Sequence, residues 1–101
     1  MKIQEKDGMI INVFAIYWFD DRTYFYGFPK SYKGLLAYKE SEVTVIEPEF
    51  TGRLIYFEKG IFHWALIKEQ LLDDLLERDE TAYNRFLKII KEEELVDPDF
   101  Y

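Results

Sequence analysis

The chain contains no cysteine and only one histidine, His63. The absence of cysteine excludes disulfides, thiolate metal sites and a cysteine nucleophile, and it suits a reducing compartment. A metal site around His63 would need further nitrogen ligands or convergent carboxylates, and no spacing in the sequence supplies them. We therefore expect neither a bound metal nor a cofactor.

Basic residues are also scarce, at 13 against 20 acidic residues, for a net charge of −7. The imbalance is uneven, because residues 1–67 carry a net charge of −1 and residues 68–101 carry −6. Such a field disfavours direct binding to a phosphate backbone and favours a basic partner. The alternative is that the acidity only keeps an aromatic-rich domain soluble.

No long hydrophobic run is present. The longest apolar stretch, residues 9–19, is shorter than the roughly 20 residues that a membrane-spanning helix needs. Acidic and basic residues balance before it, and Asp20 and Asp21 follow it where a signal peptide would carry small residues. We therefore expect a buried strand here and a cytoplasmic protein without a membrane partner. At 101 residues, the chain is expected to form one domain over residues 1–101.

The first two thirds of the chain have the pattern of short antiparallel strands between turn signals. The first and last pairs of strands are expected to form hairpins, closed by the turns Asp20-Asp21-Arg22 and Glu58-Lys59-Gly60. The strands are expected at about residues 9–19, 23–28, 35–38, 42–47, 53–57 and 61–66.

The last third has helical periodicity instead. Apolar residues from Ile67 to Leu76 form one stripe and predict a helix over about residues 67–78. A second helix is predicted over about residues 80–94, with Asp79 or Thr81 as its N-cap. Strands first and helices last predict an α+β fold. It has an antiparallel sheet of five to six strands, about residues 9–66, open or curled, covered by the two C-terminal helices.

His63 is the one side chain suited to acid–base chemistry at neutral pH. In a strand over residues 61–66, His63 would lie opposite the bulkier Phe62 and Trp64, so we expect it on the more open face. The sequence shows no Gly-x-Ser-x-Gly motif and no glycine-rich phosphate loop. We therefore expect a structural or surface histidine, not a catalytic one, and a protein that is not an enzyme. A contact of His63 with a partner is the alternative.

Acidic and aromatic residues supply the better candidates for binding. Glu69, Asp73 and Glu77 repeat at four-residue spacing, so they would line one face of the first predicted helix, either as a solvated face or as a contact for a basic partner. Fifteen of the 19 aromatic residues precede residue 68. Tyr24 and Tyr26 share one face of their strand, and consecutive aromatics must point to both faces of the sheet. Either both faces are covered, or some aromatic rings are exposed for binding.

These features favour a binding protein. The leading hypothesis is a small acidic inhibitor of the immunity type, which neutralises a basic partner such as a toxin nuclease. The alternatives are a small-molecule-binding or regulatory module with an aromatic pocket, and a structural subunit of an assembly. The residues expected to contact the partner are Glu69, Asp73, Glu77, Tyr24, Tyr26, His63 and Trp64.

Overall fold

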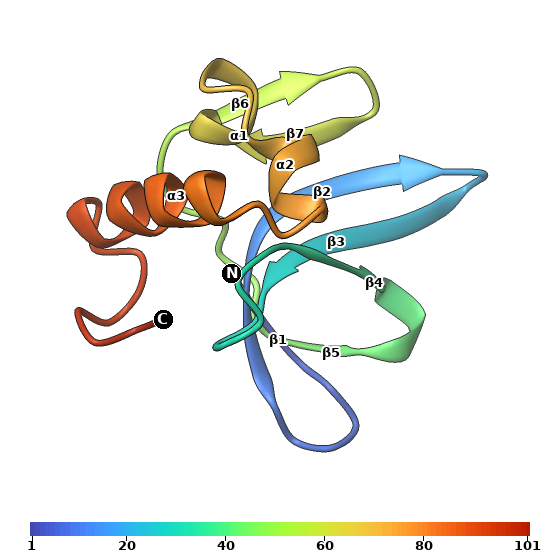
Figure 1. Cartoon of the computed structure of the whole chain (residues 1–101). Helices are drawn as coiled ribbons and strands as arrows, with labels where there is room; N and C mark the ends of the chain where they lie inside the picture. The colour runs from blue at the N-terminus through green and yellow to red at the C-terminus, as the bar shows by residue number, and fades with distance from the viewer.

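An antiparallel sheet of seven strands is followed by three helices (Figure 1). The computed structural model describes residues 1–101. The predicted α+β class is confirmed, and the sheet is not closed into a barrel. The elements are β1 (Lys2–Gln4), β2 (Ile10–Phe19), β3 (Arg22–Phe28), β4 (Leu36–Lys39), a short 3-10 helix (Glu40–Glu42), β5 (Thr44–Glu47), β6 (Leu54–Phe57), β7 (Gly60–His63), α1 (Trp64–Lys68), α2 (Leu72–Leu76) and α3 (Glu80–Glu92).

Strand β2 organises the sheet. Strand β3 pairs along one of its edges, and β4 pairs with β3. The other edge of β2 is shared: β1 pairs with its first residues, and β7 pairs with it from Ala15 to Tyr17. Strand β5 adds to β1, and β6 adds to β7. Both predicted hairpins, β2–β3 and β6–β7, are therefore present and joined through β2.

A β-bulge lies in the middle of β2. Val13 is opposite Gly27 and Ala15 is opposite Tyr26, so Phe14 is an extra residue without a partner on β3. An extra residue shifts the alternation of side chains. Val13 accordingly points to one face of the sheet, whereas Phe14 and Ala15 belong to the core on the other.

Both faces of the sheet carry a hydrophobic core. The larger core lies between the sheet and the three helices and includes Phe14, Phe28 and Phe86. The smaller core, on the opposite face, consists of Ile3, Ile11, Val13 and Phe25. Tyr17 and Tyr26 pack against the larger core, so consecutive aromatics are divided between the faces as the alternation requires.

The helical region differs from the prediction at two points. Strand β7 ends at His63, and the chain turns into α1 at Trp64, so the predicted strand over 61–66 is too long. The predicted single helix over 67–78 is wrong, because Gln70 has φ 56° and separates α1 from α2. A residue in this left-handed conformation cannot continue a right-handed helix. The last helix agrees with its prediction to within two residues, and the Asp79 carboxylate caps it by accepting the N–H of Ala82 at 2.9 Å.

The loop after β3 holds α2 in place. The N–H of Leu35 donates to the carbonyl oxygen of Leu75 at 3.0 Å. A Cβ on Gly34 would lie 2.5 Å from that same oxygen, so the close approach requires glycine. This contact fixes α2 beside the sheet, where Leu72 borders the site described next.

Candidate protein-binding surface

The two hairpins project to the same side of the molecule, away from α3 (Figure 1). Between them lies an open hollow of about 580 Å³. We call it the aromatic hollow, because six of its lining residues are aromatic. It is lined by Tyr17, Trp18, Phe19, Tyr26, Phe57, Glu58, Lys59, Phe62 and Leu72.

Local sequence explains why the hairpins meet here. Each closes through a two-residue loop, Asp20-Asp21 and Glu58-Lys59. Asp20 and Asp21 have φ values of 50° and 59°, the positive angles that the tightest hairpin turns need. Gly60 lies opposite Tyr17 in the β2–β7 pair. A Cβ on Gly60 would lie 2.7 Å from the Phe62 ring, so this glycine lets Phe62 form part of the hollow.

Three tyrosines form a stack along the sheet. The ring of Tyr17 stacks on Tyr24 with centroids 5.1 Å apart and on Tyr26 with centroids 4.6 Å apart. Burial, and secondarily the adjoining Tyr26, raise the pKa of Tyr17 above its usual value. The phenol is therefore neutral at physiological pH. The stack provides a rigid, uncharged wall, because such aromatic pairs stabilise their own geometry.

The opening of the hollow exposes large hydrophobic side chains. Phe19 is 62% exposed, Phe57 is 45% exposed and Trp18 is 41% exposed. Single exposed hydrophobics are ordinary, but a contiguous exposed patch indicates an interaction site. The grouping of these three at one opening is the main indication of function in the structure.

The rim of the hollow is acidic. Glu58 and Lys59 line it directly, and Asp20 and Asp21 lie beside Trp18 and Phe19 in an adjoining depression. Three carboxylates thus face one ammonium group. This local excess of negative charge has the same sign as the charge of the whole chain.

The predicted acidic row does not form. Glu69 is the C-cap of α1, Asp73 lies within α2, and Glu77 is the C-cap of α2, so the three do not share one helix face. The reason is the break at Gln70. Glu69 also pairs with Arg85 of α3 at 2.8 Å, which offsets its charge. Of the three, Asp73 lies nearest to the hollow in sequence, directly after Leu72.

His63 is fully buried, which corrects the expectation that it lies on the more open face. The strand alternation behind that expectation ends at His63, because Trp64 already belongs to α1. The Nδ1 atom of His63 accepts the N–H of Ala65 at 3.1 Å and caps α1. The ring proton therefore resides on Nε2, which donates to Oε1 of Glu93 at 2.5 Å. Burial lowers the pKa of His63 below 6.5, and Glu93 opposes the shift only in part.

Trp64, which is half-buried, shares the Glu93 carboxylate with His63. Its indole N–H donates to Oε2 of Glu93 at 2.6 Å, and the guanidinium of Arg53 lies over its ring at 5.1 Å. The predicted partner contacts of His63 and Trp64 stay predictions, but both side chains already have structural roles. Tyr26 lines the hollow and Tyr24 stacks behind it, so only the tyrosines among the predicted residues come together at this site.

Phe19, Phe57 and Glu93 were not identified from the sequence. A signal existed for the phenylalanines, since each directly precedes a two-residue polar turn in a predicted hairpin. Their convergence depends on the pairing of β2 with β7, which joins segments more than 40 residues apart. The role of Glu93 likewise depends on a contact with a residue 30 positions away.

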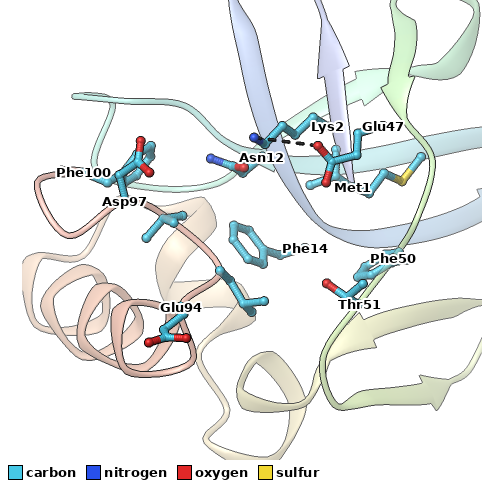
Figure 2. Close-up of a pocket in the computed structure, with 13 residues that line it drawn as sticks. Met1, Lys2, Asn12, Phe14, Glu47, Phe50, Thr51, Glu94, Asp97 and Phe100 are labelled. Atoms are coloured by element: carbon cyan, nitrogen blue, oxygen red, sulfur yellow. Dashed lines mark ion pairs between the residues drawn. The ribbon is translucent and has the colours of Figure 1, made fainter.

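A second cavity, of about 310 Å³, lies where the segment after α3 passes the sheet (Figure 2). Phe14 is one of its lining residues, with Lys2 and Glu47 on the strand side and Glu94 and Asp97 on the side of the tail. Lys2 and Glu47 form an ion pair at 3.8 Å. This cavity is smaller and more polar, and we interpret it as the seam between tail and sheet.

The structure contains no group of three or more His, Asp or Glu side chains that could hold a metal ion. None of its helices is both long and apolar enough to span a membrane. Comparison with protein-family models, with curated proteins and with solved structures gave no match. The aromatic hollow is therefore the feature from which a function can be inferred.

Proposed function

We propose that the protein is a small inhibitor of the immunity type, which binds and neutralises a basic protein such as a toxin nuclease. The binding surface is the aromatic hollow with its acidic rim. The observation that carries the proposal is the cluster of exposed Trp18, Phe19 and Phe57 around one opening bordered by carboxylates. In this proposal the chain performs no catalysis and acts in the cytoplasm, where a protein without cysteine is unaffected by reducing conditions.

The chemistry of the hollow suits a protein partner. Buried aromatic anchors supply most of the free energy of binding in protein interfaces. Phe19 and Phe57 would lose their contact with water on binding, at about 25 cal/mol for each Å² of apolar surface removed. Both lie at the ends of rigid hairpins, so little conformational entropy is lost when a partner orders them.

The charge of the protein suits a basic partner. The net charge of −7 speeds encounter with a positively charged surface, and this effect weakens as salt screens the charges. A nuclease site built for phosphate is such a surface, and acidic side chains placed over it would block its substrate. Asp73, which directly follows Leu72 of the hollow, remains a candidate contact in this proposal, whereas Glu69 is engaged by Arg85.

The test is affinity capture from the native cell's lysate at low salt, with elution by a salt gradient. The captured basic protein is then assayed for activity with and without the inhibitor. The double variant Phe19→Ser, Phe57→Ser should lose capture and inhibition while its melting temperature stays within a few degrees of the wild type. Tyr56→Ser is the matched control: this side chain is 72% exposed but does not line the hollow, so inhibition should be unchanged.

Two results would contradict the proposal. One is a captured partner whose activity the protein does not inhibit. The other is inhibition that Tyr56→Ser weakens as strongly as the double variant, because the hollow would then not be the contact.

The size of the hollow also favours a second candidate, a module that binds a small apolar molecule. A hollow of about 580 Å³ with seven hydrophobic lining residues is of the size that such ligands use. This alternative predicts a ligand-dependent rise in melting temperature with weak salt dependence. The inhibitor predicts tight binding that weakens with salt.

A further inference from the structure

We infer that the aromatic hollow receives an arginine side chain of the basic partner. This inference rests on the proposed function and names the chemistry of the group that enters the site. An arginine combines a planar, weakly hydrated cation with a long aliphatic stem, so it can use both the aromatic walls and the acidic rim.

Open ring surface is available in the hollow. Phe19 makes no ring–ring contact, and Phe57 meets only Phe62, edge to face, with centroids 6.4 Å apart. A cation placed over the face of an aromatic ring within about 6 Å is attracted by its negative face. Tyr17 contributes a neutral wall, because a tyrosine phenol is protonated at physiological pH.

Elsewhere in the molecule, three aromatic rings have a cation of the chain over their face. Arg78 lies over the ring of Tyr32 at 4.6 Å, Lys30 over Tyr101 at 4.9 Å and Arg53 over Trp64 at 5.1 Å. No cation of the chain lies over a ring of the hollow, although Lys59 is one of its lining residues. The rings of the hollow therefore remain free to receive a cation from another molecule.

The carboxylates of the rim complete the site. Glu58 lines the hollow, and Asp20 and Asp21 flank Phe19. A guanidinium can stack on a ring and donate its N–H groups to a carboxylate at the same time, which an ammonium group cannot do in one plane. An uncharged apolar side chain would use the rings but leave the carboxylates without a partner. The charge complementarity thus favours arginine over either alternative.

The probe is a short blocked peptide, Gly-Arg-Gly, titrated into the ¹⁵N-labelled protein and followed by amide chemical shifts. We expect saturable shifts at Phe19, Phe57 and Gly60. The otherwise identical citrulline peptide keeps the shape but lacks the charge, and it should bind about three- to tenfold more weakly, as expected for one cation–π contact and one exposed ion pair. A norleucine peptide tests the apolar alternative, and a lysine peptide tests the ammonium.

Glu58→Asn is the matched variant. It removes a carboxylate at φ 54°, a conformation that asparagine tolerates, so the hairpin should keep its stability. It should weaken arginine binding severalfold and leave citrulline binding unchanged, whereas Tyr56→Ala should change neither. Equal binding of arginine and citrulline, or stronger binding of norleucine, would overturn the inference.

The two proposals fail separately. If the arginine peptide binds in the hollow but no inhibited partner is found, the proposed function fails and the arginine site stands. If the partner is inhibited through the hollow but no single arginine-to-alanine change in it weakens binding, the arginine inference fails and the proposed function stands.

Discussion

Glu93 joins the end of α3 to the start of α1 through two hydrogen bonds. Its carboxylate accepts from Nε2 of His63 at 2.5 Å and from Nε1 of Trp64 at 2.6 Å. Glu93 is also the C-cap of α3, where the helix dipole disfavours a negative charge. The two donors outweigh this cost, since a hydrogen bond to a charged group contributes about 1.5–3 kcal/mol and the dipole effect is about 0.3–1 kcal/mol.

Removal of this carboxylate should therefore destabilise the fold. We expect Glu93→Ala to lower the free energy of unfolding by about 2–3 kcal/mol, because buried His63 loses the acceptor for its proton. The neighbouring Glu92 is exposed and makes no side-chain hydrogen bond, so Glu92→Ala should change stability by less than about 0.5 kcal/mol. Urea denaturation measures both. Equal losses in the two variants would show that the general charge of this segment matters, not the network.

Titration of His63 should make stability depend on pH near neutrality. Its pKa is lowered from 6.5 by burial, so below that pH the unfolded chain binds more protons than the folded chain. The stabilising contribution is then fully present above about pH 6.5 and is lost as the pH falls through the folded pKa. Protonation of Nδ1 would also place a proton against the N–H of Ala65, which now donates to it.

The variant His63→Asn isolates this effect. Asparagine offers an oxygen to cap the N–H of Ala65 but does not titrate. We expect the wild type to be the more stable protein at about pH 7.5, and its advantage to shrink as the pH falls toward about 5. Thermal unfolding across this range measures the difference. Parallel curves for the two proteins would mean that His63 does not carry the pH dependence.

Each of the three helices is followed by a non-glycine residue in the left-handed conformation. Gln70, Arg78 and Glu94 have φ values of 56°, 60° and 60°. After α2, the N–H of Asp79 donates to the carbonyl of Asp74, and the N–H of Arg78 to that of Leu75, as in a Schellman motif. The N–H groups of Gln70 and Glu94 likewise donate to the carbonyls of Ile67 and Lys91, so each helix ends without the glycine that usually marks such an end.

Gln70 is the position where glycine should help. It is exposed, and its backbone N–H donates to the carbonyl of Ile67 at 3.2 Å whatever the side chain. Relief of the steric cost of a left-handed residue outweighs the added freedom of the unfolded chain, so Gln70→Gly should raise the free energy of unfolding by about 0.5–1 kcal/mol. Gln70→Ala keeps the strain and should not raise stability. A loss in the glycine variant would mean that the side chain contributes a contact.

How well each element could be predicted depends on how strong its local sequence signal is. The hairpins and α3 have strong local signals, and their predictions are confirmed. The break at Gln70 has none, because the apolar stripe from Ile67 to Leu76 fits one helix as well as two. Strand β1, three residues long, is too short to show alternation, and it was missed. The bulge at Phe14 is likewise invisible locally, since only the pairing with β3 reveals the extra residue.

In the candidate site, too, the features set by local sequence were predictable and those set by long-range contacts were not. Alternation along β3 placed Tyr26 with Tyr24, and the structure has Tyr26 in the hollow. The consecutive rings left two alternatives open, coverage of both faces of the sheet or exposure of some rings, and the structure has a core on both faces with Trp18, Phe19 and Phe57 exposed. Which rings are exposed depends on where the helices end over the sheet and on the β2–β7 pairing. Both are contacts between distant segments, and periodicity does not encode them.

Strand β2 contributes residues to both hydrophobic cores and so connects the two faces of the molecule. Ile11 and Val13 are in the smaller core, and Phe14 and Ala15 are in the larger one. The helices pack only on the larger core, yet neither core can lose its contacts without disturbing the strand that serves the other. We therefore expect the sheet and the helices to unfold together.

A conservative change in the smaller core tests this coupling. Ile11 is fully buried, and Ile11→Val should lower the free energy of unfolding by about 0.5–1.5 kcal/mol and the melting temperature by several degrees. Ile46→Val, at an exposed position, is the matched control and should have little effect. The helical signal in far-ultraviolet circular dichroism and the aromatic signal in the near ultraviolet should shift by the same amount in Ile11→Val. A shift confined to the aromatic signal would mean that the two faces of the sheet unfold separately, and then the larger core and its helices would hold the aromatic hollow in place without the smaller one.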